Sequence, residues 1–373
     1  MVANLLAYLV QLPASRLLGP AGYGEFAVLL SAMLVMAVPA LALQSVVARE
    51  VVRGADRRGL WRLIAVVTGV VALASVGFAA AMMGIADTAA GPAFAAMAGA
   101  APLAVIAGGQ GLIQGDGRFG LLGGVLAGVG VLRSAPVIAA VVLGGGSTWA
   151  LTAGTLGTAV AALGVGALAV RTPAVRSGAP AAAPSAVLWA SGVQLVIIVA
   201  ASLDLLLSRT VLSADDAGIY ALGAVATKAA FWLPQAVGVV VYPRLADPVR
   251  STAALRSASK VLAVIGIAVT LAAAAAGPLV PTVVSPDYRP VTGLLWLFAL
   301  TGAVLAVLQL LLLAAIARDR ARGGIPASLV LALEVVCILA YADSVLSLAV
   351  IAVLSALASV LVTWLWIELS DRS

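Results

Sequence analysis

The chain has 373 residues, of which 63% are hydrophobic and only 10% charged, and it carries a net charge of +6 with a mean hydropathy of +1.17. Soluble domains are usually about 45–50% apolar and about 25% charged, so this composition excludes a soluble fold and predicts an integral membrane protein. The basic residues lie in short loops beside apolar runs, which indicates membrane lipids rather than nucleic acid as the partner.

Histidine is absent and Cys337 is the one cysteine in the sequence. This excludes histidine metal sites, histidine proton relays, the usual hydrolytic triad and an intramolecular disulfide. A G-x-G-x-x-G match at 115–120 lies between two apolar runs with no preceding strand, so it does not indicate a nucleotide site. We therefore expect no metal, no cofactor and no enzymatic activity.

Twelve apolar runs follow one another along the chain. Most are near the ~20 residues that a helix needs to cross the bilayer, and they are continuously apolar, so we predict helices rather than barrel strands. The predicted spans are 2–18, 22–48, 60–86, 91–113, 119–143, 148–170, 186–212, 217–243, 259–284, 291–317, 325–342 and 344–367. The first is short, which suggests that the true N-terminus lies upstream, and no cleavable signal peptide is expected.

The loops between these spans alternate in charge. One set carries most of the basic residues, namely Arg49, Arg53, Arg57, Arg58, Arg62, Arg118, Arg171, Arg176, Arg244, Arg250, Arg256, Lys260, Arg318, Arg320, Arg322 and Arg372. The opposite set has only Arg16, Arg209 and Arg289. Since basic loops favour the cytoplasmic side, we predict a multi-pass protein of the cytoplasmic membrane with both termini in the cytoplasm.

A weak internal repeat relates the two halves of the chain. Ser15-Arg16, Gly24, Pro39 and Arg49 are matched, at nearly constant spacing, by Ser208-Arg209, Gly218, Pro234 and Arg244. Six spans per half give the copies the same orientation, so we expect a pseudo-twofold axis along the membrane normal. The predicted domains are an N-terminal six-helix bundle over 1–170, a cytoplasmic linker over 171–185 and a C-terminal six-helix bundle over 186–373.

Small residues and prolines indicate where spans pack or bend. Gly120, Gly124 and Gly128 form a stripe of small residues on the fifth span. We expect close packing against another helix there, with a hinge for alternating access as the less favoured alternative. Pro39 and Pro234 remove backbone hydrogen bonds at matching places in the second and eighth spans, so kinks are expected there.

Three segments resemble a known family. Residues 15–27 (SRLLGPAGYGEFA) resemble the first outer loop of bacterial polysaccharide-unit flippases, residues 215–221 (DDAGIYA) resemble the matching loop between their seventh and eighth helices, and Val131-Leu132-Arg133 is similar to their fifth helix. These flippases are the O-antigen and capsule exporters of the multidrug/oligosaccharidyl-lipid/polysaccharide superfamily. The resemblance implies an all-α fold of two six-helix bundles in a V around a central cavity, and the export of lipid-linked oligosaccharides.

Four ionisable residues are predicted at membrane depth: Arg133, Asp204, Lys228 and Glu334. A charge at the bilayer centre costs about 2.5–3.5 kcal/mol on insertion scales, so such residues usually face a watery cavity or one another. Arg133 and Lys228 are candidate cavity cations for the substrate's phosphates. Asp204 and Glu334 are candidates for H⁺ or Na⁺ coupling, and the alternative for Asp204 is an ion pair with Lys228 on the adjacent span.

Arg16 and Arg209 occupy matching outer positions, where they either bind the substrate's phosphate late in transport or snorkel to headgroups. A lipid-linked sugar carries a diphosphate, and arginine's planar fork suits phosphate oxygens. Glutamines are candidate glycan contacts, with helix–helix hydrogen bonds as the alternative for each. They are Gln11, Gln44, Gln110, Gln114, Gln194, Gln235 and Gln309.

The sequence therefore favours a flippase that moves a polyprenyl-diphosphate-linked oligosaccharide across the membrane by alternating access, for lipopolysaccharide or other surface polysaccharide. The expected partners are this substrate, membrane lipids, a coupling ion and other polysaccharide-assembly membrane proteins. The first alternative is a cation-coupled multidrug exporter of the same superfamily, against which the basic cavity residues count. A membrane glycosyltransferase or polymerase is less favoured, because the outer loops are too short for a catalytic loop.

Overall fold

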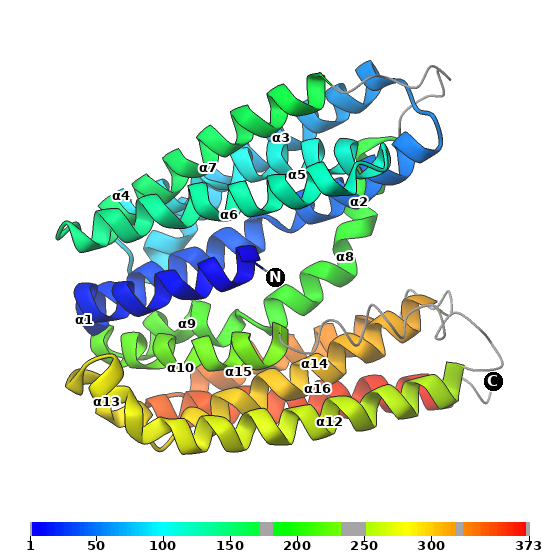
Figure 1. The fold of residues 1–373 in the computed structure, drawn as a ribbon. Helices are drawn as coiled ribbons and strands as arrows, with labels where there is room; N and C mark the ends of the chain where they lie inside the picture. Colours follow the sequence, from blue (N-terminus) through cyan, green and yellow to red (C-terminus); the bar gives the residue numbers. More distant parts are fainter. Residues whose placement is uncertain (1, 172–181, 233–250, 318–323, 371–373) are drawn as a thin grey trace. The chain divides into compact units, whose positions relative to one another are not determined.

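The computed structural model describes residues 2–171, 182–232, 251–317 and 324–370 of the chain (Figure 1). Regular structure in these ranges consists of helices, with no strand. This confirms the predicted all-α, polytopic fold class. The chain divides into two compact units, Met1–Leu195 and Val196–Ser373. The predicted V shape and pseudo-twofold axis concern the placement of one unit relative to the other, and they stay predictions, as do the domain boundaries at 171–185.

The first unit contains helices that follow the first six predicted spans closely. They are α1 (Val2–Met36), α2 (Val38–Val52), α3 (Arg57–Ile85), α4 (Ala90–Met97), α5 (Ala100–Gly115), α6 (Phe119–Val142) and α7 (Ser147–Val170). The next helix, α8 (Pro184–Ala200), runs across the division between the units after Leu195. Helices suit these runs because an apolar segment in lipid must satisfy all of its backbone hydrogen bonds internally.

The second unit contains the remaining described helices. They are α9 (Leu203–Val211), α10 (Ala214–Trp232), α12 (Ser251–Ala276), the short turns η1 (Gly277–Leu279), α13 (Val280–Val283) and η2 (Pro286–Val291), and the long helices α14 (Leu295–Ala317), α15 (Gly324–Tyr341) and α16 (Val345–Ser370). Its core includes Tyr220, Phe231 and Phe298, all fully buried, and the rings of Tyr220 and Phe298 meet edge to face at 4.9 Å.

Gly19 divides α1 into two antiparallel spans. Its backbone (φ 67°, ψ 173°) lies in a region that is essentially open to glycine only. Tyr23 Oη donates a hydrogen bond to Gln11 Oε1 over 2.9 Å, although residues twelve apart in a straight helix are about 18 Å apart. The chain therefore reverses at Gly19, and the predicted spans 2–18 and 22–48 are separate.

Replacing Gly19 with Ala is expected to destabilise the protein by about 1–3 kcal/mol, the usual cost of holding a non-glycine residue in a forbidden backbone region. The loss would come from the backbone alone, because an added Cβ meets no atom within 4 Å. Thermal unfolding in detergent measures it. Gly124→Ala is the matched control, since Gly124 is helical and equally uncrowded; an equal loss of melting temperature in both variants would contradict the assignment.

The described helices are consistent with twelve spans. Within the described residues, eight helices are long and apolar enough to cross a membrane, and nine are if the bent pair α8 and α9 forms one span. That count treats Leu9–Val52 as one helix, although Gly19 splits it, and it omits α10 and the shorter apolar helix Ile325–Tyr341. The second span breaks at Ala37, two residues before Pro39; Pro234 lies outside the described residues.

In the first unit, close helix packing occurs at glycines of α5 and α7, not at the expected glycine stripe of α6. A Cβ added at Gly111 would lie 2.6 Å from the carbonyl oxygen of Gln44, and one at Gly115 would lie 2.8 Å from that of Ala48. These glycines let α5 approach the backbone of α2. The stripe on α6 has no such neighbour: Cβ atoms at Gly120, Gly124 and Gly128 would meet nothing within 4 Å among the described residues, so the expected packing of this stripe is wrong.

Candidate functional site

A cavity of about 420 Å³ lies within the first unit, lined by residues of α1, α2, α4, α5, α6 and α7. Its walls are mainly apolar, and the polar side chains that reach it include Gln11, Gln44, Gln110, Arg133, Thr155 and Thr158. None of the described residues that line it is an acid, and Arg133 is the charged one among them. The structure thus brings together three of the predicted glutamines and one predicted cation.

Arg133 is half-buried on α6 and faces this cavity. A Cβ at Gly154 would lie 2.8 Å from Val137 Cγ2, so the glycines of α7 bring that helix close to α6 around Arg133. Among the described residues Arg133 has no hydrogen-bond or ion-pair partner. A cation that is partly withdrawn from water and not compensated by an acid creates a site for an anion.

The glutamines around the cavity differ in their bonding. Gln11 accepts from the Tyr23 hydroxyl, and Gln44 Nε2 donates to Gln114 Oε1 over 3.1 Å, which is a helix–helix bond between α2 and α5. Gln110 is only 6% exposed, and it has no hydrogen-bond partner in the described part of the chain. Because Gln110 lines the cavity, its amide is open to a ligand or to water there.

The second unit holds a separate cluster of buried ionisable residues on α9, α10 and α15. Asp204 and Glu334 are each 4% exposed, and Lys228 is half-buried. The Tyr220 hydroxyl donates to Asp204 Oδ2 over 2.5 Å, and the Leu205 backbone N–H donates to Asp204 Oδ1 over 2.8 Å. The charges of Lys228 and Glu334 both act on Asp204.

Sequence reasoning missed the part that Tyr220 plays in this cluster. The residue is fully buried, and a buried tyrosine hydroxyl usually finds a hydrogen-bond partner, so its place inside an apolar span was the available signal. In the part of the chain that the structure describes, no three His, Cys, Asp or Glu side chains gather closely enough to hold a metal ion.

The remaining predicted site residues are dispersed. Arg16 is exposed on α1 before the Gly19 turn, and it is not among the residues that line the cavity. Arg209 is half-buried in the last turn of α9. Gln194 and Gln309 are half-buried on α8 and α14, and Gln235 lies outside the described residues.

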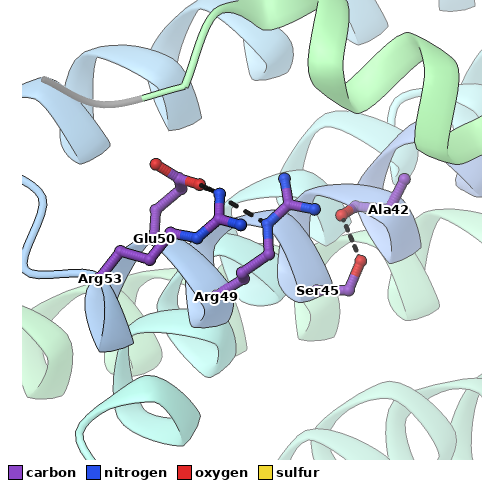
Figure 2. Close-up of polar contacts among 5 residues, drawn as sticks. All are labelled: Ala42, Ser45, Arg49, Glu50 and Arg53. Carbon is purple, nitrogen blue, oxygen red and sulfur yellow. Dashed lines mark hydrogen bonds and ion pairs between the residues drawn. The ribbon is translucent and has the colours of Figure 1, made fainter.

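Two ion-pair groups lie at helix ends on the basic side of the first unit, one within the last turn of α2 and one between helices. Figure 2 shows Glu50 paired with both Arg49 and Arg53: Oε1 of this buried side chain lies 3.6 Å from Arg49 Nε and 3.2 Å from Arg53 Nη1. Arg57 holds both carboxylate oxygens of Asp116, at 3.2 and 3.1 Å, and donates to the Ala169 carbonyl. Bidentate pairing of this kind ties the start of α3 to the ends of α5 and α7.

No protein-family model and no curated protein matches the chain. Solved structures do. An inward-facing multidrug resistance MATE family transporter of the MOP superfamily aligns with a TM-score of 0.72 at 14% identity, covering 100% of this chain and 95% of that one. The lipid II flippase MurJ, in an inward closed conformation, aligns with a TM-score of 0.71 at 10% identity, covering 98% of this chain and 86% of that one. The Vibrio cholerae MATE transporter VcmN, in its bent form, aligns with a TM-score of 0.57 at 16% identity, covering 97% of this chain and 93% of that one. The chain shares its fold with these proteins.

Proposed function

We propose that this protein is a flippase that moves a polyprenyl-diphosphate-linked oligosaccharide across the cytoplasmic membrane by alternating access, in the synthesis of a surface polysaccharide. The observation that carries the proposal is Arg133, a cation without a protein partner among the described residues, in a cavity to which none of them contributes an acid. A fold shared with a lipid II flippase supports it, and so do the O-antigen flippase motifs at 15–27 and 215–221.

The cavity chemistry suits the middle of such a substrate. The diphosphate cannot cross hydrocarbon without replacing its hydration, and the Arg133 guanidinium presents a fork of donors to phosphate oxygens. Gln110 offers donors and an acceptor to a sugar hydroxyl at the same wall. The polyprenyl tail needs no protein cavity, because it can remain in lipid while the polar part passes. Arg16 and Arg209 then act as later phosphate contacts in the transport cycle.

The buried cluster of the second unit is the proposed coupling site. With Asp204 and Glu334 both ionised and Lys228 protonated, these three groups would sum to one negative charge inside an apolar bundle. An uncompensated buried charge is costly, so a proton or a Na⁺ ion would balance it. Binding and release of that ion would then change the stability of this unit as the transporter changes conformation.

The second candidate is a cation-coupled multidrug exporter, favoured by the fold of the MATE transporters and by the mainly apolar walls of the cavity. An exporter of cationic drugs would profit from an acid in the cavity, whereas the charged lining residue that the structure describes is Arg133. The flippase is therefore the better match.

Reconstitution distinguishes the two functions. Purified protein in proteoliposomes is given either a fluorescent undecaprenyl-diphosphate oligosaccharide or the cationic dye ethidium, under an imposed pH or Na⁺ gradient. We expect the lipid-linked glycan to reach the opposite leaflet, as shown by its accessibility to a glycan-cleaving enzyme. We expect no transport of the dye across the membrane. Dye transport without glycan transport would establish the exporter instead.

The orientation belongs to the same proposal. The basic loops favour a topology with both termini in the cytoplasm. A reporter that is active only in the cytoplasm should therefore be active when it is fused to either terminus. The proposed domains are bundles over 1–170 and 186–373 joined by the 171–185 linker. Other membrane proteins of polysaccharide assembly would take up the flipped product.

A further inference from the structure

The exposed face of α3 carries a pair of cations followed by an apolar column. Arg58 and Arg62 are exposed and lie one helical turn apart at the start of the helix. Further along the same face, Val66, Val70 and Leu73 are 42%, 58% and 78% exposed. Their spacing of three or four residues places all five side chains in one line along the helix. The line begins with two guanidinium groups and continues with hydrocarbon.

The second unit repeats this arrangement on α12, the ninth predicted span. Arg256 and Lys260 are exposed one turn apart, and Val264, Ile267 and Leu271 follow on the same face with exposures of 68%, 62% and 64%. Only 17% of the apolar window of this helix is buried, against 72% for α14, so α12 presents most of its surface to lipid. The third and ninth predicted spans thus carry the same surface pattern.

These four cations differ from their neighbours in having no partner among the side chains that the structure describes. In the described ranges none of the four makes a hydrogen bond or an ion pair. The adjacent Arg57, in contrast, is held by Asp116, and the nearest acid in sequence, Asp56, caps α3 by accepting from the Gly59 N–H at 3.1 Å. The paired cations are therefore available to an external anion.

We propose that α3 and α12 each bind an anionic phospholipid. The phosphate lies between the two cations, whose Cβ atoms one turn apart are about 5–6 Å from each other, and an acyl chain lies along the apolar column. Arginine binds phosphate oxygens through two parallel hydrogen bonds, and basic residues at the membrane surface attract anionic headgroups. The pair of cations next to a continuous apolar face favours a diacyl lipid over free phosphate, because free phosphate has no acyl chain to contact the apolar column.

Native mass spectrometry of the full-length protein in detergent tests this. The protein is incubated with equal amounts of phosphatidylglycerol and phosphatidylcholine that have the same acyl chains. Each cation near the headgroup is worth roughly a factor of five, so a pair gives a preference for the anionic lipid of roughly thirty-fold. The wild-type protein is expected to hold two phosphatidylglycerol molecules tightly. Each double variant, Arg58→Gln/Arg62→Gln or Arg256→Gln/Lys260→Gln, should hold one, and the variant with both pairs replaced should hold none.

The controls separate lipid binding from charge in general and from misfolding. Arg118→Gln/Arg171→Gln removes two exposed cations that are not one turn apart on a helix, and it should leave both lipids bound. Arg58→Lys/Arg62→Lys keeps the charge and should retain its lipid. Displacement of the lipid by inorganic phosphate at moderate excess would reassign the sites to free phosphate. Equal binding of both lipids, or unchanged binding in the fourfold variant, would overturn the proposal and leave the pairs as simple topology signals.

Discussion

Replacement of Arg133 by Gln is expected to abolish most glycan export while leaving the protein folded in the membrane. Loss of a charge-assisted contact to a buried phosphate costs about 1.5–3 kcal/mol, which corresponds to roughly a ten- to hundred-fold reduction of transport. Because Arg133 has no protein partner among the described residues, its removal leaves no acid unpaired. The measurement is export of surface polysaccharide in cells, with the rate in proteoliposomes as the quantitative value.

Three comparisons make this result interpretable. Arg133→Lys keeps the charge but loses the fork, so it should recover part of the rate. Arg118→Gln removes an exposed cation outside the cavity and should transport normally. Gln110→Leu should lower the rate more for long glycans than for a single sugar if Gln110 contacts the glycan. Wild-type export by Arg133→Gln, at normal protein levels, would remove Arg133 from the substrate site.

Replacement of Lys228 by Gln is expected to lower the stability of the second unit. Lys228→Gln removes a half-buried cation whose charge acts on the buried Asp204. We expect a loss of stability below the about 3–5 kcal/mol that breaking a fully buried charge pair typically costs. Thermal unfolding in detergent should show this loss. Adding Asp204→Asn to Lys228→Gln should restore most of the stability, because the remaining buried groups then carry less uncompensated charge.

Transport by the same variants separates structure from coupling. If Asp204 serves only to pair with Lys228, the double variant should transport as well as the wild type. If Asp204 takes part in ion coupling, the double variant will be stable but will no longer respond to a pH or Na⁺ gradient. Tyr220→Phe provides an intermediate case, since it removes the hydrogen bond to Asp204 and leaves its charge in place.

Much of the fold could be predicted because lipid imposes a simple rule on the chain. Continuous apolar runs of sufficient length must form helices, and most of the described helices follow the predicted spans to within a few residues. The largest difference among the described helices is α12, which begins at Ser251, eight residues before the predicted start at 259. The pairing of helices was harder to predict. The stripe of glycines on α6 has the composition of a packing face, yet the close approaches occur at glycines of α5 and α7, because which face meets a neighbour depends on the whole bundle.

The sequence by itself determined that this is a helical membrane protein, and it identified the residues whose charge is expensive at membrane depth, because transfer free energy depends on residue type alone. The tertiary structure decided which of those residues meet. It placed Arg133 with Gln11, Gln44 and Gln110 at one cavity, and Asp204 with Tyr220 at another position, since side chains far apart in sequence come together only through the packing of several helices. It also revealed the shared surface pattern of α3 and α12, because exposure is a property of the folded bundle.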